Sequence, residues 1–394
     1  MSTLRVNNLQ STSTTDGGIS IDTSGNVTLP ANTKVGTQNL PSAGPFSNRN
    51  LIINGAMQVA QRGTSASVSD GTNEGYQTLD RFAFLFGASA DGAATISQST
   101  TVPSGQGFSN SYKVDVTTTN TPSGTENIFI RHEIEAQNLR NSGWNYTSAS
   151  SYITLSFWAR SSKTGTYCLW LNMQDTTTND YYCAEYTLVE NTWKKVEINI
   201  PGHSNAVINN DNGSGLEIDW VLASNQTGAT AGVWSDTADR ATSNQVNVFD
   251  STDGEFYLTG VQLEVGSVAT PFEHRSYGDE LARCQRYYWN AVLGDDASNS
   301  TIGQGTNYNG ITGFVTIYPP VSMRTAPSLE VSNATNSYIA YESSGSTNIS
   351  TFNFDSATQP NAIEFSAAIG GSQGNAFILR RQDVNALLRF SAEL

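Results

Sequence analysis

Residues 256–289, FYLTGVQLEVGSVATPFEHRSYGDELARCQRYYW, decide how this chain is organised. Apolar residues mostly alternate along the first part of this stretch, which predicts a strand. The residues expected to share one side of that strand are Tyr257, Thr259, Val261, Leu263 and Val265. The Gly266 turn and the Thr270–Pro271 step then end the strand, because proline has no N–H and restricts the residue before it.

A short helix follows the strand, and Asp279 is its predicted N-cap. Leu281, Cys284 and Tyr288 fall at i, i+3 and i+7, so they are expected to share one helical face. This narrow apolar stripe either packs on its own chain or meets copies of itself at an oligomer axis, and the sequence leaves both open. The three residues are therefore candidates for an oligomer interface. A closing strand followed by such a helix predicts the end of one domain and the start of the next.

The composition predicts an all-β protein of two or three domains. Only 14% of the 394 residues are charged, against roughly 25% in an average soluble protein. Ser, Thr, Asn, Gln and Gly carry the polarity instead, and these residues suit strand faces and turns better than helices. The net charge of −15 argues against nucleic acid or an anionic membrane as a partner, because both need a basic surface.

No targeting or membrane-spanning segment is evident. Met1 is followed by polar residues, and no apolar run approaches the ~20 residues that cross a bilayer. We therefore expect synthesis in a cytoplasm and no membrane insertion. The three cysteines do not form a disulfide framework. Cys168 and Cys183 could face each other across a hairpin, but buried free thiols are expected in a chain made in reducing cytosol.

Residues 1–48 lack a sizeable apolar cluster. Alternation at 19–22 and 26–29 predicts a hairpin across 23–25, and Leu4, Val6 and Leu9 indicate a short strand before it. Such a segment buries too little surface to fold alone. It is either a disordered tail or an extended arm that folds against partner subunits or a docking protein, and the alternation favours the arm.

Residues 49–275 are predicted to form one jelly-roll β-sandwich, because many short strands alternate with turn signals. The expected strands are 51–53, 81–85, 94–98, 111–116, 128–134, 151–160, 166–172, 181–188, 193–200, 216–223, 245–250 and 255–265. The expected core comprises Phe82, Phe84, Val114, Leu155, Phe157, Leu169, Leu171, Val196, Ile198, Ile218, Trp220, Val248 and Leu258. The order of 156–160, a hairpin, 193–196 and the closing strand resembles that of non-catalytic carbohydrate-binding jelly rolls, a likeness of fold that does not establish sugar binding.

Residues 276–394 begin with the hinge helix and continue as a small C-terminal β-sandwich, expected to be a tip domain. The predicted strands are 313–318, 328–331, 338–341, 362–368, 376–381 and 386–390. An apolar strand as late as 386–390 must be tied into a core or an interface.

No catalytic or metal site stands out. His132, His203 and His274 lie in separate segments without zinc-ligand spacing, and neither a G-x-S-x-G elbow nor a phosphate-binding glycine loop is present. The Asn-, Asp- and Gly-rich segment 210–217 lacks EF-hand spacing and is expected to be a turn. The resemblance to carbohydrate-binding jelly rolls, which often carry one structural calcium, keeps a single structural calcium as a weaker alternative. A glycosidase needs two carboxylates roughly 5–9.5 Å apart, and nothing singles out such a pair. We therefore expect no enzyme activity and no cofactor.

Aromatic residues in polar loops are the glycan-binding candidates: Trp144, Tyr146, Trp234 and Tyr308. A flat ring flanked by Asn, Ser and Gly suits a sugar, because the ring contacts its C–H face while amides bind the hydroxyls. The alternative is that each tryptophan folds back to cover its own sandwich, since large aromatic side chains are mostly buried.

Four segments also carry a family resemblance. They are VQLEVGSVATPFE at 261–273 followed by CQRYY at 284–288, MSTLRVN at 1–7, NLIINGAMQVAQRG at 50–63 and FSAEL at 390–394. Together and in this arrangement they resemble tail-fibre and related appendage proteins of tailed bacteriophages, many of them marine, including cyanophages.

The resemblance implies a structural virion protein, a homotrimeric tail fibre located in the tail. Residues 1–48 would dock on a phage tail protein (an adaptor or nozzle), and the β domains would bind a host cell-surface receptor, a glycan or a protein. One alternative is a capsid decoration or head-fibre protein, with 1–48 bound to a shell protein. Another is a polysaccharide depolymerase, which the lack of a long repetitive β-helix disfavours.

Overall fold

The computed structural model describes residues 8–10, 18–21, 27–28, 34–35, 38–39, 47–88, 90–176, 180–292, 299–331, 337–343, 345–349, 351–355 and 358–394. Within these residues the chain is almost entirely β-structure, and the predicted all-β class is confirmed. The helical elements described are α1 (Ala136–Arg140), α2 (Tyr277–Gln285) and the 3-10 turn η1 (Val248–Asp250). Among the described residues, no helix is long and apolar enough to cross a membrane.

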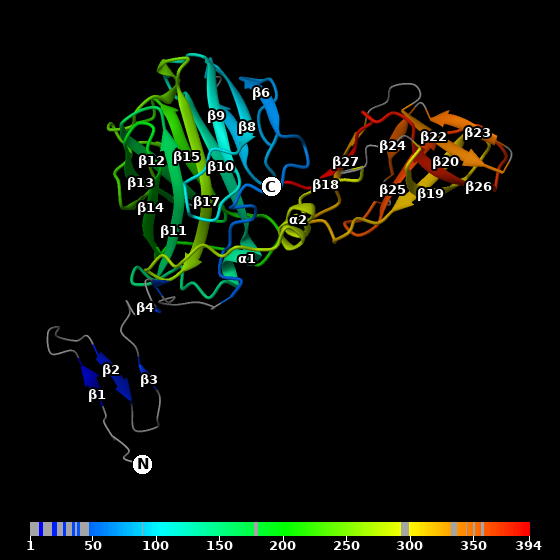
Figure 1. Ribbon diagram of the computed structural model, residues 1–394. Helices are drawn as coiled ribbons and strands as arrows, with labels where there is room; N and C mark the ends of the chain where they lie inside the picture. The colour runs from blue at the N-terminus through cyan, green and yellow to red at the C-terminus, as the bar shows by residue number, and fades with distance from the viewer. Residues whose placement is uncertain are drawn as a thin grey trace.

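The larger part of the chain is a sandwich of two antiparallel sheets (Figure 1). Sheet I has the order β16 (Trp234–Ser235), β13 (Asp180–Leu188), β12 (Gly165–Met173), β15 (Ser214–Ser224), β10 (Asn127–Glu135), β7 (Ala83–Gly87). Sheet II has the order β14 (Lys194–Pro201), β11 (Tyr152–Ser161), β17 (Glu255–Val265), β9 (Ser111–Thr118), β8 (Ala93–Ser99), β6 (Ser65–Ser69). Consecutive strands therefore cross repeatedly between the two sheets.

The core of the sandwich lies between the two sheets. Every core residue predicted from the alternation belongs to it, from Phe82 in the segment before β7 to Leu258 on β17. The aromatic rings interlock there: Phe157 meets Trp220 edge to face, with ring centroids 5.8 Å apart. Edge-to-face packing of this kind adds to the stability gained by burying apolar area.

β17 departs from the predicted alternation at a β-bulge. Phe256 and Leu258 face the core before Gly260, whereas Val261 and Leu263 face it afterwards. Gly260 has φ +62°, and the register with β11 shifts at this point. Two residues of β17 thus oppose one of β11, a bulge whose first residue needs the left-handed conformation that glycine adopts at least cost. The prediction that Tyr257 and Thr259 share a side with Val261 was therefore wrong.

Two other predicted strands are not strands in the structure. Residues 51–53 run beside β17, with the Leu51 N–H donating to the Leu263 carbonyl at 2.9 Å, but they form no ladder. Residues 245–250 end in η1, where the Asn247 side chain caps the turn by accepting the Phe249 N–H. β6 and β16 were not predicted, because their small and polar residues give a weak strand signal.

The helix α2 begins one turn earlier than its predicted cap. Ser276 is the N-cap: its Oγ accepts the Asp279 N–H at 3.2 Å and donates to the Asp279 carboxylate at 2.8 Å. Asp279 therefore lies inside the first turn, where its charge favours the helix dipole. The helix ends at Gln285, so Tyr288 belongs to the following strand β18 (Tyr288–Asn290) rather than to the helical stripe.

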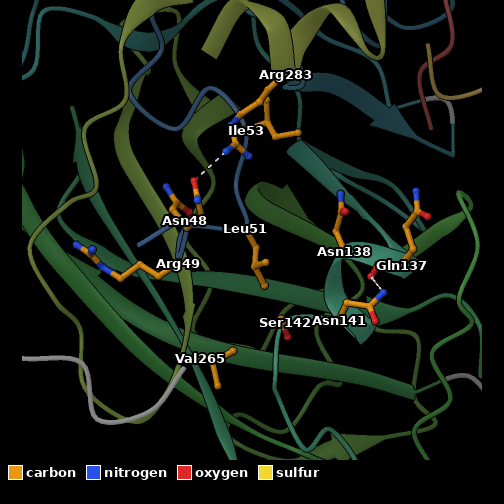
Figure 2. Close-up of a pocket in the computed structure, with 11 residues that line it drawn as sticks. Asn48, Arg49, Leu51, Ile53, Gln137, Asn138, Asn141, Ser142, Val265 and Arg283 are labelled. Atoms are coloured by element: carbon orange, nitrogen blue, oxygen red, sulfur yellow. Dashed lines mark hydrogen bonds between the residues drawn. The ribbon is translucent and has the colours of Figure 1, made fainter. Parts of the chain in front are cut away.

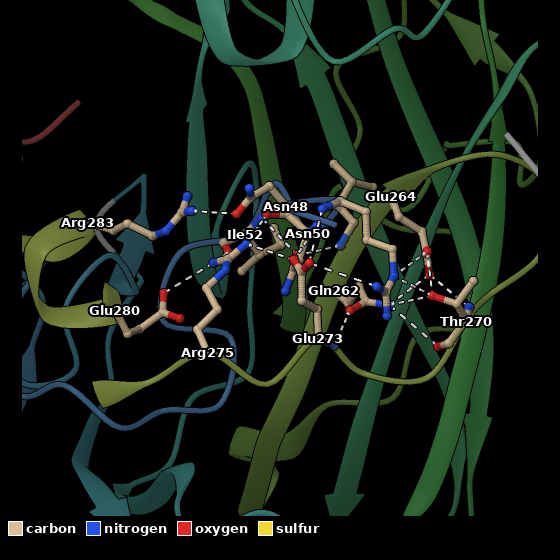
Figure 3. A network of polar contacts seen from close by, with 12 residues as sticks. Asn48, Asn50, Ile52, Gln262, Glu264, Thr270, Glu273, Arg275, Glu280 and Arg283 are labelled. Carbon is tan, nitrogen blue, oxygen red and sulfur yellow. Dashed lines mark hydrogen bonds and ion pairs between the residues drawn. The ribbon is translucent and has the colours of Figure 1, made fainter. Parts of the chain in front are cut away.

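A group of polar side chains, the anchor network, fastens residues 48–54 to β17 and to the segment before α2 (Figure 3). Asn50 donates to the Val261 carbonyl and accepts the Leu263 N–H at 3.1 Å. Glu264 accepts both the N–H and the hydroxyl of Thr270, at 2.9 and 2.6 Å. The network is completed by Gln262, Glu273, Arg275 and Glu280. Its bonds span more than two hundred positions of sequence, so it closes the sandwich.

The strands after α2 form two further sheets, and neither includes a strand that precedes α2. The larger has the order β23 (Gly345–Ile349), β22 (Tyr338–Glu342), β26 (Ala376–Arg381), β19 (Thr301–Asn307), β20 (Thr312–Ile317), β25 (Ile363–Ala368), β24 (Phe352–Phe354). The smaller has the order β18, β27 (Leu388–Ser391), β21 (Ser328–Val331). They share one apolar core, in agreement with the predicted second β-rich region, although β18, β19, β23 and β24 were missed.

Glu393 joins this second region to the sandwich. Its carboxylate pairs with Arg62 at 3.1 Å and with Arg81, whose side chain is fully buried. The Arg62 guanidinium lies over the Tyr288 ring and that of Arg81 over the Tyr287 ring, at 3.4 and 3.6 Å from the centroids. We call these residues the junction cluster. Both arginines are withdrawn from water and therefore need a counter-charge nearby. The Glu393 carboxylate pairs with both of them.

The N-terminal strands described are β1 (Asn8–Gln10), β2 (Gly18–Ile21), β3 (Val27–Thr28), β4 (Lys34–Val35) and β5 (Gln38–Asn39). β2 and β3 pair antiparallel, as the predicted hairpin requires, with Ile21 opposite Val27. The residues 22–26 between them, and the predicted Leu4 and Val6, lie outside the described residues.

Candidate functional site

Two hollows in the sandwich surface could hold a ligand. The first, about 370 Å³ in volume, lies between residues 48–53 and α1 (Figure 2). Amides from Gln137, Asn138 and Asn141 face it, together with the Arg283 guanidinium. Its polar groups largely bind one another, since Arg283 donates to Asn48 at 3.2 Å and Asn141 donates to the Gln137 carbonyl at 2.7 Å. No lining side chain of this hollow carries a buried polar atom that lacks a partner, so it offers a ligand little unmet bonding.

The second hollow, which we call the groove, lies on the outer face of sheet I and has a volume of about 390 Å³. Strand alternation builds it: Leu169 and Leu171 on β12 point into the core, so Trp170 points outward. Tyr181 on β13 and Arg131 on β10 project from the same face, and Arg240 reaches over it from the loop between β16 and η1. The groove thus combines side chains from four strands (β10, β12, β13 and β15) and from the loops beside them.

A stacked pair of aromatic rings forms one wall of the groove. The rings of Trp170 and Tyr181 are nearly parallel, at 22° and with centroids 5.0 Å apart. The Arg240 guanidinium lies 4.1 Å from the Trp170 centroid, in a cation–π contact. Trp170 is buried by these neighbours, whereas Tyr181 remains half-buried and is the ring that a ligand can reach. A tyrosine held by stacking is a rigid platform for the apolar face of a sugar.

Four charges cross the floor of the groove; we call them the groove quartet. Arg131 binds Glu217 at 2.7 Å and Asp219 at 2.8 and 3.0 Å, and Arg240 also pairs with Asp219. Burial raises the pKa of Asp219 above its ordinary value, while the charges of Arg131 and Arg240 oppose that rise. The two positive charges of the guanidiniums and the two negative charges of the carboxylates cancel at neutral pH.

Two buried polar atoms of the groove have no hydrogen-bond partner: the indole Nε1 of Trp170 and the carboxamide Oδ1 of Asn127. The two side chains are 2% and 4% exposed. A buried polar atom without a partner costs about 1–3 kcal/mol. Other such atoms, for example Trp220 Nε1, lie within the sandwich core, but these two belong to side chains that line the groove.

A small apolar cluster beneath the loop supports the groove. Cys168, Cys183 and Val221 pack there against Ala241. Both thiols are free and buried, as expected from the sequence. Cys168 stands opposite Glu185 and Cys183 opposite Trp170, so the two cysteines are diagonal neighbours. Diagonal Cα atoms lie about 7–8 Å apart, beyond the usual span of a disulfide.

The structure brings two of the predicted glycan-binding residues, Trp144 and Tyr146, into ring contact with centroids 6.3 Å apart, but the four do not form one exposed platform. Trp144 is 3% exposed and belongs to the core, so it covers its own sandwich and is not a surface platform. Tyr146 is half-buried beside it and accepts a hydrogen bond from Arg140 at 2.9 Å. Trp234 packs against the core and donates to the Pro201 carbonyl at 2.8 Å. Tyr308 is 63% exposed, in the region after α2 and far along the chain from the others.

Two of the three interface candidates are inside the chain. Cys284 and Tyr288 are 0% and 1% exposed, so neither side chain is available to a second copy. Cys284 faces the sandwich from α2, and Tyr288 packs under Arg62 in the junction cluster. Leu281 is half-buried and remains a candidate. Cys284 and Tyr288 therefore pack on their own chain, which is the alternative to an oligomer axis that the sequence left open.

The metal expectation rests on the segment 210–217. Asp211 Oδ1 accepts the Gly213 N–H at 2.9 Å, and Asn210 accepts a hydrogen bond from Asn141, as in a turn. Within the described ranges, no group of three or more His, Cys, Asp or Glu side chains is placed to hold a metal ion. The single structural calcium stays a prediction.

Sequence reasoning missed the groove residues because it searched loops for aromatic rings. A signal was present in the strand 166–172, where Trp170 and Cys168 take the positions opposite to Leu169 and Leu171. A strand that is apolar on both sides is expected to be covered on both sides. The cover here is the loop that carries Arg240 and Ala241.

No family model matches the chain, and no curated protein matches it. Among solved structures, the chain resembles an enzymatically active domain of tailspike protein 4 from bacteriophage CBA120, at 14% identity and a TM-score of 0.29, over 55% of this chain and 21% of that chain. It also resembles a protein described as sugar-binding from Bacteroides thetaiotaomicron, at 11% identity and a TM-score of 0.32, over 55% and 99%. A third, a family 61 carbohydrate-binding module in complex with β-1,4-galactotriose, has 13% identity and a TM-score of 0.24, over 55% and 98%. Scores this low carry no argument about function, and the chain spans about a fifth of the tailspike chain.

Proposed function

We propose that this chain is a non-catalytic attachment protein of a tailed bacteriophage that binds a host cell-surface glycan in the groove. The observation that carries the glycan assignment is the groove itself: a half-buried Tyr181 stacked on Trp170, beside buried polar atoms that lack partners. Rings supply the apolar contact and unmet donors and acceptors bind hydroxyls, which is the combination that sugar recognition requires. The phage assignment rests on the resemblance of the four sequence segments.

The non-catalytic part of the proposal rests on the carboxylates of the groove. Glu217 and Asp219 are both held by Arg131, and Glu217 also accepts the Asn172 amide at 2.8 Å. A general acid or nucleophile of a glycosidase must exchange protons with the substrate. Carboxylates saturated by guanidinium and amide donors are instead suited to holding the floor of the groove rigid.

In the proposed assembly the chain is a homotrimeric tail fibre. Residues 1–48 would dock on a tail protein of the particle, an adaptor or nozzle, and the sandwich would face the host. Light scattering on the full-length chain tests this: a mass three times that of the chain supports the fibre. A monomer would overturn the fibre and favour the capsid-decoration alternative.

Glycan binding is tested with full-length protein on an array of bacterial surface oligosaccharides. We expect binding by the native chain and a loss of about five- to tenfold in Tyr181→Ala, since an aromatic contact contributes roughly 1–1.5 kcal/mol. Tyr308→Ala is the matched control, because it removes an exposed tyrosine outside the sandwich. A loss confined to Tyr308→Ala would move the site to the second region, and no binding by the native chain would refute glycan recognition.

A further inference from the structure

Asn127 lines the groove, and the orientation of its carboxamide is fixed by its neighbours. Its Nδ2 donates to the Thr125 carbonyl at 2.9 Å and to Gln226 Oε1 at 2.8 Å. A flipped amide would place an acceptor against both of these oxygens, so the orientation is determined by the neighbours. Asn127 Oδ1 is therefore an acceptor that needs a donor from outside the protein.

Gly87 makes room for that oxygen. It stands directly opposite Asn127 in the ladder of β7 and β10. A Cβ atom at Gly87 would lie 2.3 Å from Asn127 Oδ1, closer than real Cβ contacts allow. Any larger residue at this position would displace the carboxamide. Asn127 Oδ1 thus occupies space that a side chain at position 87 would take.

The second unsatisfied atom, Trp170 Nε1, is a donor that needs an acceptor. A ligand that satisfies both atoms must therefore accept at Trp170 and donate at Asn127. Hydroxyl groups do both, whereas carboxylates and sulfates only accept and ammonium groups only donate. The pair of unsatisfied atoms has the bonding pattern of a polyol.

The charges of the groove add a second argument. Each guanidinium of the groove quartet already binds a carboxylate of the same quartet. An anionic ligand would have to compete with Glu217 or Asp219 for Arg131 or Arg240, and the displaced carboxylate would be left buried without its partner. The net charge of −15 also repels anions at long range.

We propose that Asn127 and Trp170 form a hydroxyl-reading pair, and that the groove selects neutral glycans over uronic-acid or sulfated ones. This inference rests on the proposed function, because it takes the groove as the glycan site. It adds the chemical class of the ligand and the residues that determine it.

The test compares neutral oligosaccharides with their anionic counterparts of the same linkage, for example β-1,4-linked manno-oligosaccharides and β-1,4-linked mannuronate oligosaccharides, on an array carrying many such pairs. The full-length protein is expected to bind the neutral member of its best pair at least tenfold more tightly, measured by calorimetry. Equal or tighter binding of the anionic member overturns the selection.

Two variants test the reading pair. Trp170→Phe removes the indole N–H and keeps a ring, and Gly87→Ala displaces the Asn127 amide without removing a polar atom. Each is expected to weaken neutral-glycan binding about five- to tenfold, the effect of one hydrogen bond. The controls are Trp220→Phe, whose indole N–H is also unpartnered but lies in the core, and Gly278→Ala, where a Cβ meets nothing. Both controls should retain native affinity.

The outcomes separate the inference from the proposed function. Unchanged affinity in Trp170→Phe and Gly87→Ala, with binding lost in Tyr181→Ala, overturns the reading pair and leaves the groove as the glycan site. Native affinity in all three variants overturns the groove as the site, and no glycan bound by the native chain overturns glycan recognition altogether.

Discussion

The anchor network and the groove lie on the same sandwich, yet the polar side chains that line the groove are less completely hydrogen-bonded than those of the anchor network. In the anchor network the amides and carboxylates of Asn50, Gln262 and Glu264 all have partners within the chain, and only Arg275 Nε lacks one. Around the quartet, Trp170 and Asn127 keep unsatisfied atoms beside a hollow. A cluster whose polar atoms all have hydrogen-bond partners is expected to be structural. Buried polar atoms that lack partners beside a hollow are what a ligand-binding site is expected to have.

The segments that resemble phage appendage proteins contain residues of the anchor network and of the junction cluster, but none that line the groove. Asn50, Gln262 and Glu264 of the anchor network, and Tyr288 and Glu393 of the junction cluster, all lie in segments that resemble phage appendage proteins. The groove residues lie outside every one of those segments. The resemblance therefore concerns how the β-regions are closed and joined, and the part that we propose binds the ligand belongs to the rest of the chain.

The largest expected effect is in the junction cluster. Glu393→Ala would leave Arg81 fully buried without its counter-charge, and breaking such a pair from one side costs about 3–5 kcal/mol. Urea unfolding should show this loss, while glycan affinity stays native because the groove is untouched. Glu330→Ala removes an exposed partner of Arg389 and should cost at most about 1 kcal/mol. Similar small losses in both variants would contradict the structural assignment of the cluster.

Gly260 is the next test, because its bulge determines which side chains of β17 enter the anchor network. An alanine would have to adopt φ +62°, with its Cβ 2.6 Å from Phe108 Cζ. The left-handed conformation costs roughly 1–2 kcal/mol and crowding about as much again, so a loss of about 2–4 kcal/mol is expected in denaturant unfolding. Gly143→Ala is the matched control, since its φ is +89° but its Cβ meets nothing. Equal losses would show that crowding by Phe108 contributes nothing.

The sequence predicted what depends on local alternation. Leu155 and Phe157, for example, were placed in the core because one face of their strand is apolar, and the structure confirms them. Alternation could not reveal the bulge at Gly260, because the residues on both sides of it continue an apolar pattern and only the pairing with β11 shows the shift. Which side chains of β17 face the core therefore depends on how the strand pairs with β11.

The groove was unpredictable for a related reason. Asn127, Trp170 and Arg240 lie far apart in the sequence, and each has an ordinary local context. The polar neighbours of Trp144 predicted an exposed loop, but the packing of the loop after α1 buries its ring in the core. What distinguishes Trp170 is an N–H without a partner at a hollow, a property that exists only once the sheet has formed.

The smallest expected effect is a difference in pH dependence between the two clusters. Burial opposes ionisation of Glu273, but the Asn50 N–H and the Arg275 charge outweigh it and hold the pKa of Glu273 below its ordinary value of 4.5. Its stabilisation is thus complete above that value and is lost only as the pH falls through the lowered pKa. Burial raises the pKa of Asp219 above 3.8. As the solution is acidified, Asp219 in the groove is therefore protonated before Glu273 in the anchor network.

Protonation of Asp219 leaves Arg131 and Arg240 with one carboxylate between them, which gives the groove a net positive charge. As the pH falls from 7, binding of the neutral oligosaccharide should therefore weaken, and discrimination against the anionic one should narrow, before the anchor network loses its stability. Calorimetric titrations and urea unfolding at matched pH values between 7 and 3 measure the two events. In Asp219→Asn the narrowing should already be present at pH 7. If unfolding precedes any change in discrimination, the two clusters do not differ in the way their bonding predicts.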